Sequence, residues 1–243
     1  MRKWLVFILI VLALLIISII AHLNPRPTGP VYLEFEILQD PNTILLSMYG
    51  EPPQFAIWLE DPISGRYKTL FVTYRSALGD WIGQTEIPSS LPRWFEVFKT
   101  EFYSASIPTI NNPAPDSVTG ATPLTDHFII RAPVEHSSKW ICWIEMNQSG
   151  DFNETYKLHD REKKKYDSAF TAQPPLLYRT EITAVPGRRL TPELYGMSLL
   201  NGSDTVTVRT LDDTVTTAKD LFKSITIRVI RPGDDTIKIY EEK

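Results

Sequence analysis

The chain has 243 residues and a formal net charge of −4 at pH 7, with a pI near 5.6. Because it has no basic patch beyond a short cluster at residues 161–165, its charge argues against nucleic acid as the main partner. The single cysteine, Cys142, excludes an internal disulfide, a redox pair and a cysteine-ligated cluster within this chain.

Residues 1–24 predict a signal-anchor or transmembrane helix. An uncharged apolar run extends from Trp4 to Ala21, and at about 1.5 Å per residue it is long enough to cross the hydrocarbon core of a bilayer. Arg2 and Lys3 place the N-terminus in the cytoplasm, so the bulk of the chain is expected on the extracytoplasmic side, in the periplasm or at the cell exterior. The alternative is a cleaved signal peptide, although the run exceeds the usual apolar core and ends in a poor cleavage site.

Residues 25–30 contain three prolines and predict a short linker, after which residues 31–243 predict one extracytoplasmic domain. The segment from Val31 to Ile37 alternates apolar and polar residues, which is the period of a half-buried strand. Further strands are expected where β-branched and aromatic residues cluster between turn residues. These strands are expected at residues 55–60, 67–74, 127–131, 140–146, 176–184, 205–210, 224–230 and 236–241.

Few helices are expected. Residues 91–107 predict a short helix because their aromatic residues recur at roughly helical spacing, with Pro92 in the first turn. Residues 216–222 predict one or two further helical turns. Residues 108–123 contain four prolines and two consecutive asparagines, and they predict a surface loop.

This series of short strands with proline- and glycine-containing turns predicts an all-β fold, an immunoglobulin-like β-sandwich that follows one N-terminal transmembrane helix. Trp58, Trp140 and Trp143 are the expected core anchors, because aromatic side chains bury the largest apolar area. Cys142 lies in the same strand-like run and is expected to be a buried small hydrophobe.

The most informative stretch is Asp116 to Thr122, which fits the pattern Asp, two free positions, Thr or Ser, Gly, Ala, Thr. Such a match arises by chance in roughly one chain of this length per thousand. The stretch resembles the acceptor site at which FAD:protein FMN transferases attach FMN to a threonine hydroxyl. The resemblance implies that Thr122 carries FMN through a phosphoester, and that Asp116 and Thr119 are recognition elements.

The residues beside Thr122 suit such a reaction. Gly120 and Ala121 leave no bulk next to the hydroxyl, and Gly120 also permits a positive φ angle. Asp116 and Thr119 are expected to shape the turn through hydrogen bonds from their side chains to the local backbone. The alternative is an ordinary turn between two strands, since Asp, Thr and Gly are common turn residues.

A linked flavin would need aromatic surface and a counter-charge for its phosphate. Trp81, Trp94 and Tyr103 are candidates to stack on the ring, because they lie in or near loops before the motif. The alternative for Trp94 and Tyr103 is the core of the short helix. His127 or Arg131 is a candidate to neutralise the phosphate, although each is as readily solvated at a strand end.

The chain also resembles a group of uncharacterised bacterial periplasmic β-sandwich proteins, whose genes tend to accompany flavin-transfer enzymes and membrane redox proteins. The resemblance implies the same sandwich and an association with flavinylated membrane redox systems. The segments that carry it are residues 55–61 with 67–71, 116–122, 143–154 and 173–178.

We therefore expect a membrane-anchored extracytoplasmic flavoprotein that transfers electrons through FMN on Thr122 and is a redox carrier more than a catalyst. Its expected partners are a FAD:protein FMN transferase, membrane redox proteins and, through residues 4–21, the lipid bilayer. No catalytic residue or metal site is predicted: the four histidines lack ligand spacing, and the calcium-loop-like start at residues 151–154 lacks the glycine and the closing glutamate. The alternatives are a cofactor-free binding or scaffold module of the cell envelope and a carbohydrate-binding sandwich that uses Trp81.

Overall fold

The computed structural model describes Trp4 and residues 10–16, 29–80, 87–157, 172–201 and 205–234. Most of the predicted membrane segment lies outside these ranges, as does the strand expected at residues 236–241. Of the helices within the described ranges, none is long and apolar enough to cross a bilayer.

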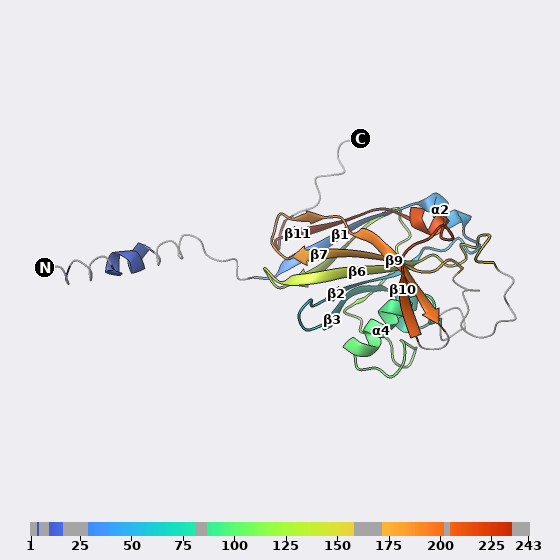
Figure 1. Ribbon diagram of the computed structural model, residues 1–243, viewed down its shortest axis with the longest axis horizontal. Helices are drawn as coiled ribbons and strands as arrows, with labels where there is room; N and C mark the ends of the chain where they lie inside the picture. Colours follow the sequence, from blue (N-terminus) through green and yellow to red (C-terminus); the bar gives the residue numbers. More distant parts are fainter. Residues whose placement is uncertain are drawn as a thin grey trace.

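Two β-sheets form the body of the described chain and confirm the predicted all-β sandwich (Figure 1). The strands are β1 (Val31–Gln39), β2 (Gln54–Glu60), β3 (Tyr67–Thr73), β4 (Thr119–Gly120), β5 (His127–Val134), β6 (Lys139–Asn147), β7 (Leu176–Thr183), β8 (Arg189–Leu190), β9 (Glu193–Asn201), β10 (Thr205–Arg209) and β11 (Phe222–Ile230). The described helices are α2 (Pro41–Leu46), α3 (Tyr74–Leu78), α4 (Pro92–Glu101) and the 3₁₀ helix η1 (Thr217–Asp220).

One sheet has the strand order β5-β1-β11-β8 and the other the order β10-β9-β7-β6-β2-β3-β4. Neighbouring strands in the described chain pair antiparallel, except that β4 pairs in parallel with β3. The predicted helix after Pro92 is confirmed as α4, and the predicted turns near residue 216 are confirmed as η1.

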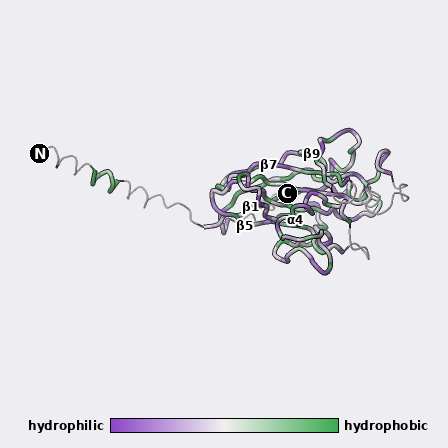
Figure 2. Tube along the Cα trace, turned by 60° about the horizontal axis from the view of Figure 1, so that its bottom comes forward, coloured by the Kyte–Doolittle hydropathy of each residue, from purple (hydrophilic) through white to green (hydrophobic). Residues whose placement is uncertain are grey.

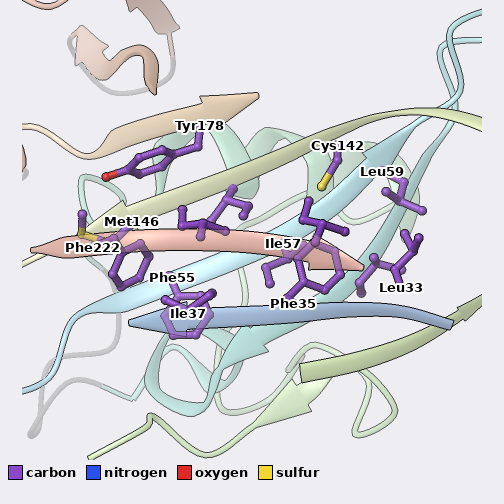
Figure 3. Close-up of a cluster of buried hydrophobic side chains, with 14 of the residues drawn as sticks. Leu33, Phe35, Ile37, Phe55, Ile57, Leu59, Cys142, Met146, Tyr178 and Phe222 are labelled. Carbon is purple, nitrogen blue, oxygen red and sulfur yellow. The ribbon is translucent and has the colours of Figure 1, made fainter. Parts of the chain in front are cut away.

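The main apolar core lies between the two sheets. Leu33, Phe35 and Ile37 take alternate positions on β1 and are fully buried, as the period of two predicts. Figure 3 shows them in one cluster with Phe55 and Ile57 of β2 and with side chains from β6, β7 and β11. Each fully buried side chain of this size contributes about 1.5–3 kcal/mol to stability, so this cluster is the main reason why the sheets stay together.

A second apolar cluster lies on the outer face of the seven-stranded sheet, under α4. On β2 the residues that alternate with the main core, among them Trp58, face this cluster. Trp94, Phe95 and Phe98 of α4 cover them, so α4 forms a third layer (Figure 1). The structure therefore confirms Trp58 as a buried anchor, whereas Trp143 is only half-buried beside it.

The remaining two core predictions concern β6. Trp140 is half-buried and packs against the edge of the main core, so it is not a central anchor. Cys142 is buried and free, and burial raises the pKa of its thiol. It is a small hydrophobe of the core, as predicted.

Two carboxylates fasten α4 to the sheet. At its start, the fully buried Glu145 accepts hydrogen bonds from the backbone N–H of Arg93 (3.1 Å) and of Trp94 (2.7 Å) and from the hydroxyl of Ser198. The two N–H groups belong to the first turn, where a helix has no internal acceptor for them. Burial raises the pKa of Glu145 to about 7.

At the end of α4, Glu101 accepts the backbone N–H of Thr69 with both carboxylate oxygens, each at 2.9 Å. Thr69 lies in β3, so Glu101 occupies the outer edge of this strand beyond its short pairing with β4. The loop that follows α4 therefore starts from a fixed point.

Several elements were not predicted, namely α2, α3, β4, β8 and β9. The clearest case is β9, which has a glycine in its interior and no apolar alternation. A Cβ on Gly196 would lie 2.4 Å from the carbonyl oxygen of Arg209 in β10. The neighbouring backbone therefore requires glycine there, although glycine argues against a strand when the sequence is read alone.

β1 connects the two ends of the sandwich. Its first residue, Val31, pairs with Val134, while its last residues pair with the start of β5 and lead into α2. A strand of nine residues spans about 30 Å. We call the end at Val31 the linker end and the other the α2 end; hydrophobic residues recur along the strands between them (Figure 2).

Candidate functional site

The acceptor-like segment, which we define as residues 116–122, lies on the edge of the seven-stranded sheet at the α2 end. Thr119 and Gly120 form β4 and pair with Val72 and Thr73 at the end of β3. The N–H of Val72 donates to the carbonyl of Val118 (2.9 Å). The predicted surface loop is confirmed for the rest of the segment, in which Asp116 and Ala121 are exposed.

Thr119 and Gly120 shape the segment, one as predicted and one for a different reason. The hydroxyl of Thr119 donates to the carbonyl of Pro115 (3.0 Å), which confirms the predicted local hydrogen bond. Gly120 is not among the residues with positive φ, so the backbone does not use the freedom that glycine permits there. A Cβ at this position would instead lie 2.1 Å from the ring of Phe71, and glycine is required because the backbone crosses that ring closely.

Asp116 does not stabilise the turn with its side chain, so the predicted local hydrogen bond of this residue is wrong. In the described part of the chain its exposed carboxylate has neither a hydrogen bond nor an ion pair. The N–H groups that it could have bound are taken by main-chain carbonyls, at Val118 by Pro115 (3.1 Å) and at Thr119 by Asp116 itself (3.3 Å).

Thr122 lies in a short span between two fixed points. On one side is β4, and on the other is the buried Gln39. The side-chain amide of Gln39 donates to the carbonyls of Pro123 (3.3 Å) and Thr125 (2.6 Å). Thr122 itself is half-buried, and within the described ranges its hydroxyl has no hydrogen-bond partner.

Thr122 is one of the residues that line an open hollow of about 590 Å³. The other lining residues are Tyr74 and Arg75 of α3 and further residues of the acceptor-like segment. Arg75 forms an ion pair with Glu51, in which the distance from Nη2 to Oε1 is 3.2 Å. This arginine is the basic group that the structure places beside Thr122.

Sequence reasoning missed Tyr74 and Arg75. They lie more than forty residues before Thr122 and come close to it only because β4 pairs in parallel with β3, directly before α3. A two-residue parallel pairing leaves no periodic signal in the sequence. The one sequence feature that could have pointed to Arg75 is its position as a basic residue directly after a predicted strand.

The phosphate partners proposed from the sequence do not lie in this hollow. His127 forms an ion pair with Glu36 (3.2 Å), and Arg131 with Glu34 (2.7 Å). All four residues belong to the four-stranded sheet, on β5 and β1. Neither His127 nor Arg131 lines the hollow at Thr122, and both are paired with carboxylates of β1 on the other sheet.

The three aromatic candidates have three different outcomes. Trp94 is fully buried in the cluster under α4, so its alternative as a core residue is confirmed. Tyr103 is 96% exposed, not part of a helix core, and has φ of 52°. It lines a second hollow of about 440 Å³ with Phe98 and Phe102. Trp81 lies outside the described residues.

The described residues contain no group of three or more His, Cys, Asp or Glu side chains that could hold a metal ion. At the calcium-loop-like stretch, the carboxylate of Asp151 instead accepts hydrogen bonds from the backbone N–H (3.1 Å) and the side-chain amide (3.1 Å) of Gln173. Burial raises the pKa of Asp151 to about 8. Asp151 thus joins two segments of the fold.

Comparison of the chain with models of known protein families, with curated proteins and with solved structures found no match.

Proposed function

We propose that this protein is a membrane-anchored, extracytoplasmic electron-transfer protein that carries FMN on Thr122 through a phosphoester. One observation carries the proposal: Thr122 lines an open hollow at a sheet edge, and its hydroxyl has no hydrogen-bond partner in the described chain. A transferase must bring this hydroxyl to a pyrophosphate in its own active site, so an accessible and unengaged oxygen is what the reaction needs.

The surroundings of Thr122 fit the group. Ala121 is exposed and Gly120 has no side chain, so no bulky residue of the segment stands beside the hydroxyl. The hollow offers open space on the same side. When bound, FMN supplies the electron-transfer chemistry, while the chain fixes the position of the linkage and contributes charge and aromatic surface.

The linkage needs no oxidant or reductant. Oγ1 of Thr122 attacks the phosphorus atom on the FMN side of the FAD pyrophosphate. A phosphorus–oxygen bond to Thr122 forms, the bond between this phosphorus and the oxygen bridging to AMP breaks, and AMP leaves. The hydroxyl proton passes to a base of the transferase.

The proposal includes the finer predictions for the rest of the chain, namely a membrane helix over residues 4–21 and an immunoglobulin-like arrangement of the sandwich. The apolar run and the two basic residues before it support an N-terminal anchor. The partners are then a FAD:protein FMN transferase and membrane redox proteins on the extracytoplasmic side.

Intact mass after co-expression with a FAD:protein FMN transferase tests the proposal. We expect the full chain to gain one FMN-phosphoryl unit and Thr122→Ala to gain none. Thr125→Ala is the matched control: Thr125 lies three residues away, but its hydroxyl donates to the carbonyl of His127 (2.8 Å). A folded wild-type chain without the added mass would refute the proposal.

The second candidate is a cofactor-free binding or scaffold module, and one observation favours it. Four large apolar side chains around α2 are exposed, namely Leu45, Leu46, Met48 and Tyr49. Such a cluster is typical of a docking surface. This candidate predicts that a partner from the cell envelope binds the unmodified protein, and that Leu46→Glu weakens this binding whereas Ile63→Glu, at an exposed residue of the linker end, does not.

A further inference from the structure

The hollow at Thr122 combines three chemical groups that the sequence keeps apart. Thr122 supplies a hydroxyl, Arg75 a guanidinium and Tyr74 an aromatic ring that is 53% exposed. Their relative position is fixed by the parallel pairing of β3 with β4. A hydrogen bond from the N–H of Ala114 to the carbonyl of Ala77 (2.8 Å) adds a second link between α3 and the chain before the acceptor-like segment.

An ion pair holds Arg75 in place but leaves some of its N–H donors free. Its ion pair with Glu51 engages both Nη atoms, and the carbonyl of Glu51 accepts a hydrogen bond from the buried side-chain amide of Gln148 (2.8 Å). A guanidinium has five N–H donors, so donors remain for a second anion. Arginine is suited to this role because its planar donors match the oxygens of a phosphate.

Charge decides on which side of the hollow an anion would lie. Arg75 is the basic residue of the lining, and Asp116 is its acidic residue. A phosphoester on Thr122 carries negative charge, which Asp116 repels and Arg75 attracts. The phosphate is therefore expected against α3.

The competing position for the flavin ring is the second hollow, next to Tyr103. Its lining contains aromatic residues, serines, an asparagine and prolines, but no charged residue, and Thr122 is not part of it. It lacks both the attachment point and a partner for the phosphate. Only the first hollow supplies all three groups.

We propose that Tyr74 and Arg75 form the binding site of the linked FMN, in which Arg75 donates to the phosphate oxygens and Tyr74 packs against the isoalloxazine ring. This inference rests on the proposed function and adds where the cofactor lies. Stacking on a tyrosine quenches flavin fluorescence and restricts the motion of the ring, which gives readouts other than electron transfer.

The test compares flavinylated full-length variants made by co-expression with the transferase and verified by intact mass. For Tyr74→Leu we expect a several-fold rise in fluorescence yield and a lower anisotropy than in wild type. For Arg75→Gln we expect a changed ³¹P chemical shift of the phosphoester and again a lower anisotropy. Thermal unfolding of each variant checks that the fold is retained.

Two matched controls are expected to behave as wild type. Tyr103→Leu removes the exposed tyrosine of the second hollow, and Arg66→Gln removes an exposed arginine at the linker end that is paired with Asp61. A rise in fluorescence in Tyr103→Leu, or wild-type values in both Tyr74→Leu and Arg75→Gln, would refute the proposed binding site for the flavin while leaving Thr122 as the attachment site. Absence of the mass gain in wild type would refute both the attachment of FMN to Thr122 and the proposed binding site.

Discussion

Two loops of this protein contain Asp, hydroxyl residues and Gly, and they use these residues differently. In the hairpin between β2 and β3, the carboxylate of Asp61 accepts the N–H groups of Ile63 (2.8 Å) and Ser64 (3.2 Å), and Gly65 has φ of 66°. These hydrogen bonds, led by that of Ile63, hold the pKa of Asp61 below its ordinary value. Asp61 and Gly65 are thus both needed by the turn itself.

In the acceptor-like segment, the corresponding residues are not needed by the turn. Within the described chain, the carboxylate of Asp116 and the hydroxyl of Thr122 have no partner, and main-chain groups close the turn instead. The ordinary-turn alternative accounts for Thr119 and for Gly120, which is pressed on Phe71, but not for these two groups. Asp116 and Thr122 are therefore available to a molecule outside the chain, which supports the acceptor proposal.

The largest expected effect is a dependence of the stability of the whole sandwich on pH. Variants of the two loops should therefore be compared at one fixed pH. Burial raises the pKa of Glu145 from 4.5 to about 7. The folded state then holds a proton that the unfolded state has lost, so the stability contribution is complete below pH 4.5 and disappears as the pH rises through about 7. We expect Glu145 alone to lower the free energy of unfolding by up to about 3 kcal/mol between pH 5 and 8.

Urea unfolding across this pH range measures the effect. Asp151 acts in the same direction, since burial raises its pKa to about 8. Glu145→Gln should therefore flatten the slope in part and Asp151→Asn should remove a further part. A stability that rises with pH in wild type would contradict the assignment.

The two loop glycines should respond unequally to alanine. Gly120→Ala places a Cβ against the ring of Phe71 and is expected to cost about 3 kcal/mol, because the close-packed strand edge must shift. Gly65→Ala meets no neighbouring atom, and its positive φ costs only about 1 kcal/mol. Equal losses in chemical denaturation would contradict the contact between Gly120 and Phe71.

Removing the brace behind Thr122 should cost less. Gln39→Ala deletes two hydrogen bonds to the carbonyls of Pro123 and Thr125, and we expect a loss of about 2 kcal/mol. Limited proteolysis should then cut the chain near residues 122–126 faster than in wild type, while the hairpin at the linker end keeps its resistance. Unchanged cleavage at these residues would show that the brace does not fix the loop.

The smallest expected effect separates the two aspartates most directly. Asp61→Ala loses the hydrogen bonds of its turn and should lower stability measurably, whereas Asp116→Ala should stay within about 0.5 kcal/mol of wild type. In the co-expression assay the order reverses: Asp116→Ala is expected to lose most of the FMN mass gain, and Asp61→Ala to keep it. Loss of stability without loss of flavinylation in Asp116→Ala would favour the interpretation of the acceptor-like segment as an ordinary turn.

The features that sequence reasoning recovered are those with a repeating local signal. The alternation in β1 and the aromatic spacing in α4 follow from the periods of strand and helix. β1 was predicted close to its actual limits, whereas α4 starts where predicted but ends at Glu101, well before residue 107. The loop that bears Thr122 was found because prolines and glycine mark it. By contrast, β9 was missed because Gly196 makes room for a backbone that is distant in the sequence.

At the site, too, residues close in the sequence were predicted and residues brought together only by the fold were missed. Asp116, Thr119 and Thr122 were identified because they are close in the chain, but Arg75 and Tyr74 reach the hollow only through the parallel pairing of β3 with β4. His127 and Arg131 were considered as phosphate partners for the opposite reason. They are near Thr122 in the sequence, but the chain crosses to the other sheet between them.

The carboxylate of Glu101, which takes the N–H of Thr69 on the outer side of β3, has a consequence for behaviour at high concentration. An uncovered strand margin is a template on which another polypeptide can extend the sheet, and this is a common start of fibril growth. Here a helix terminus occupies the margin at Thr69, and β4 occupies it at Val72 and Thr73. Many copies of this domain at high concentration would therefore lie side by side without their fusing along that margin.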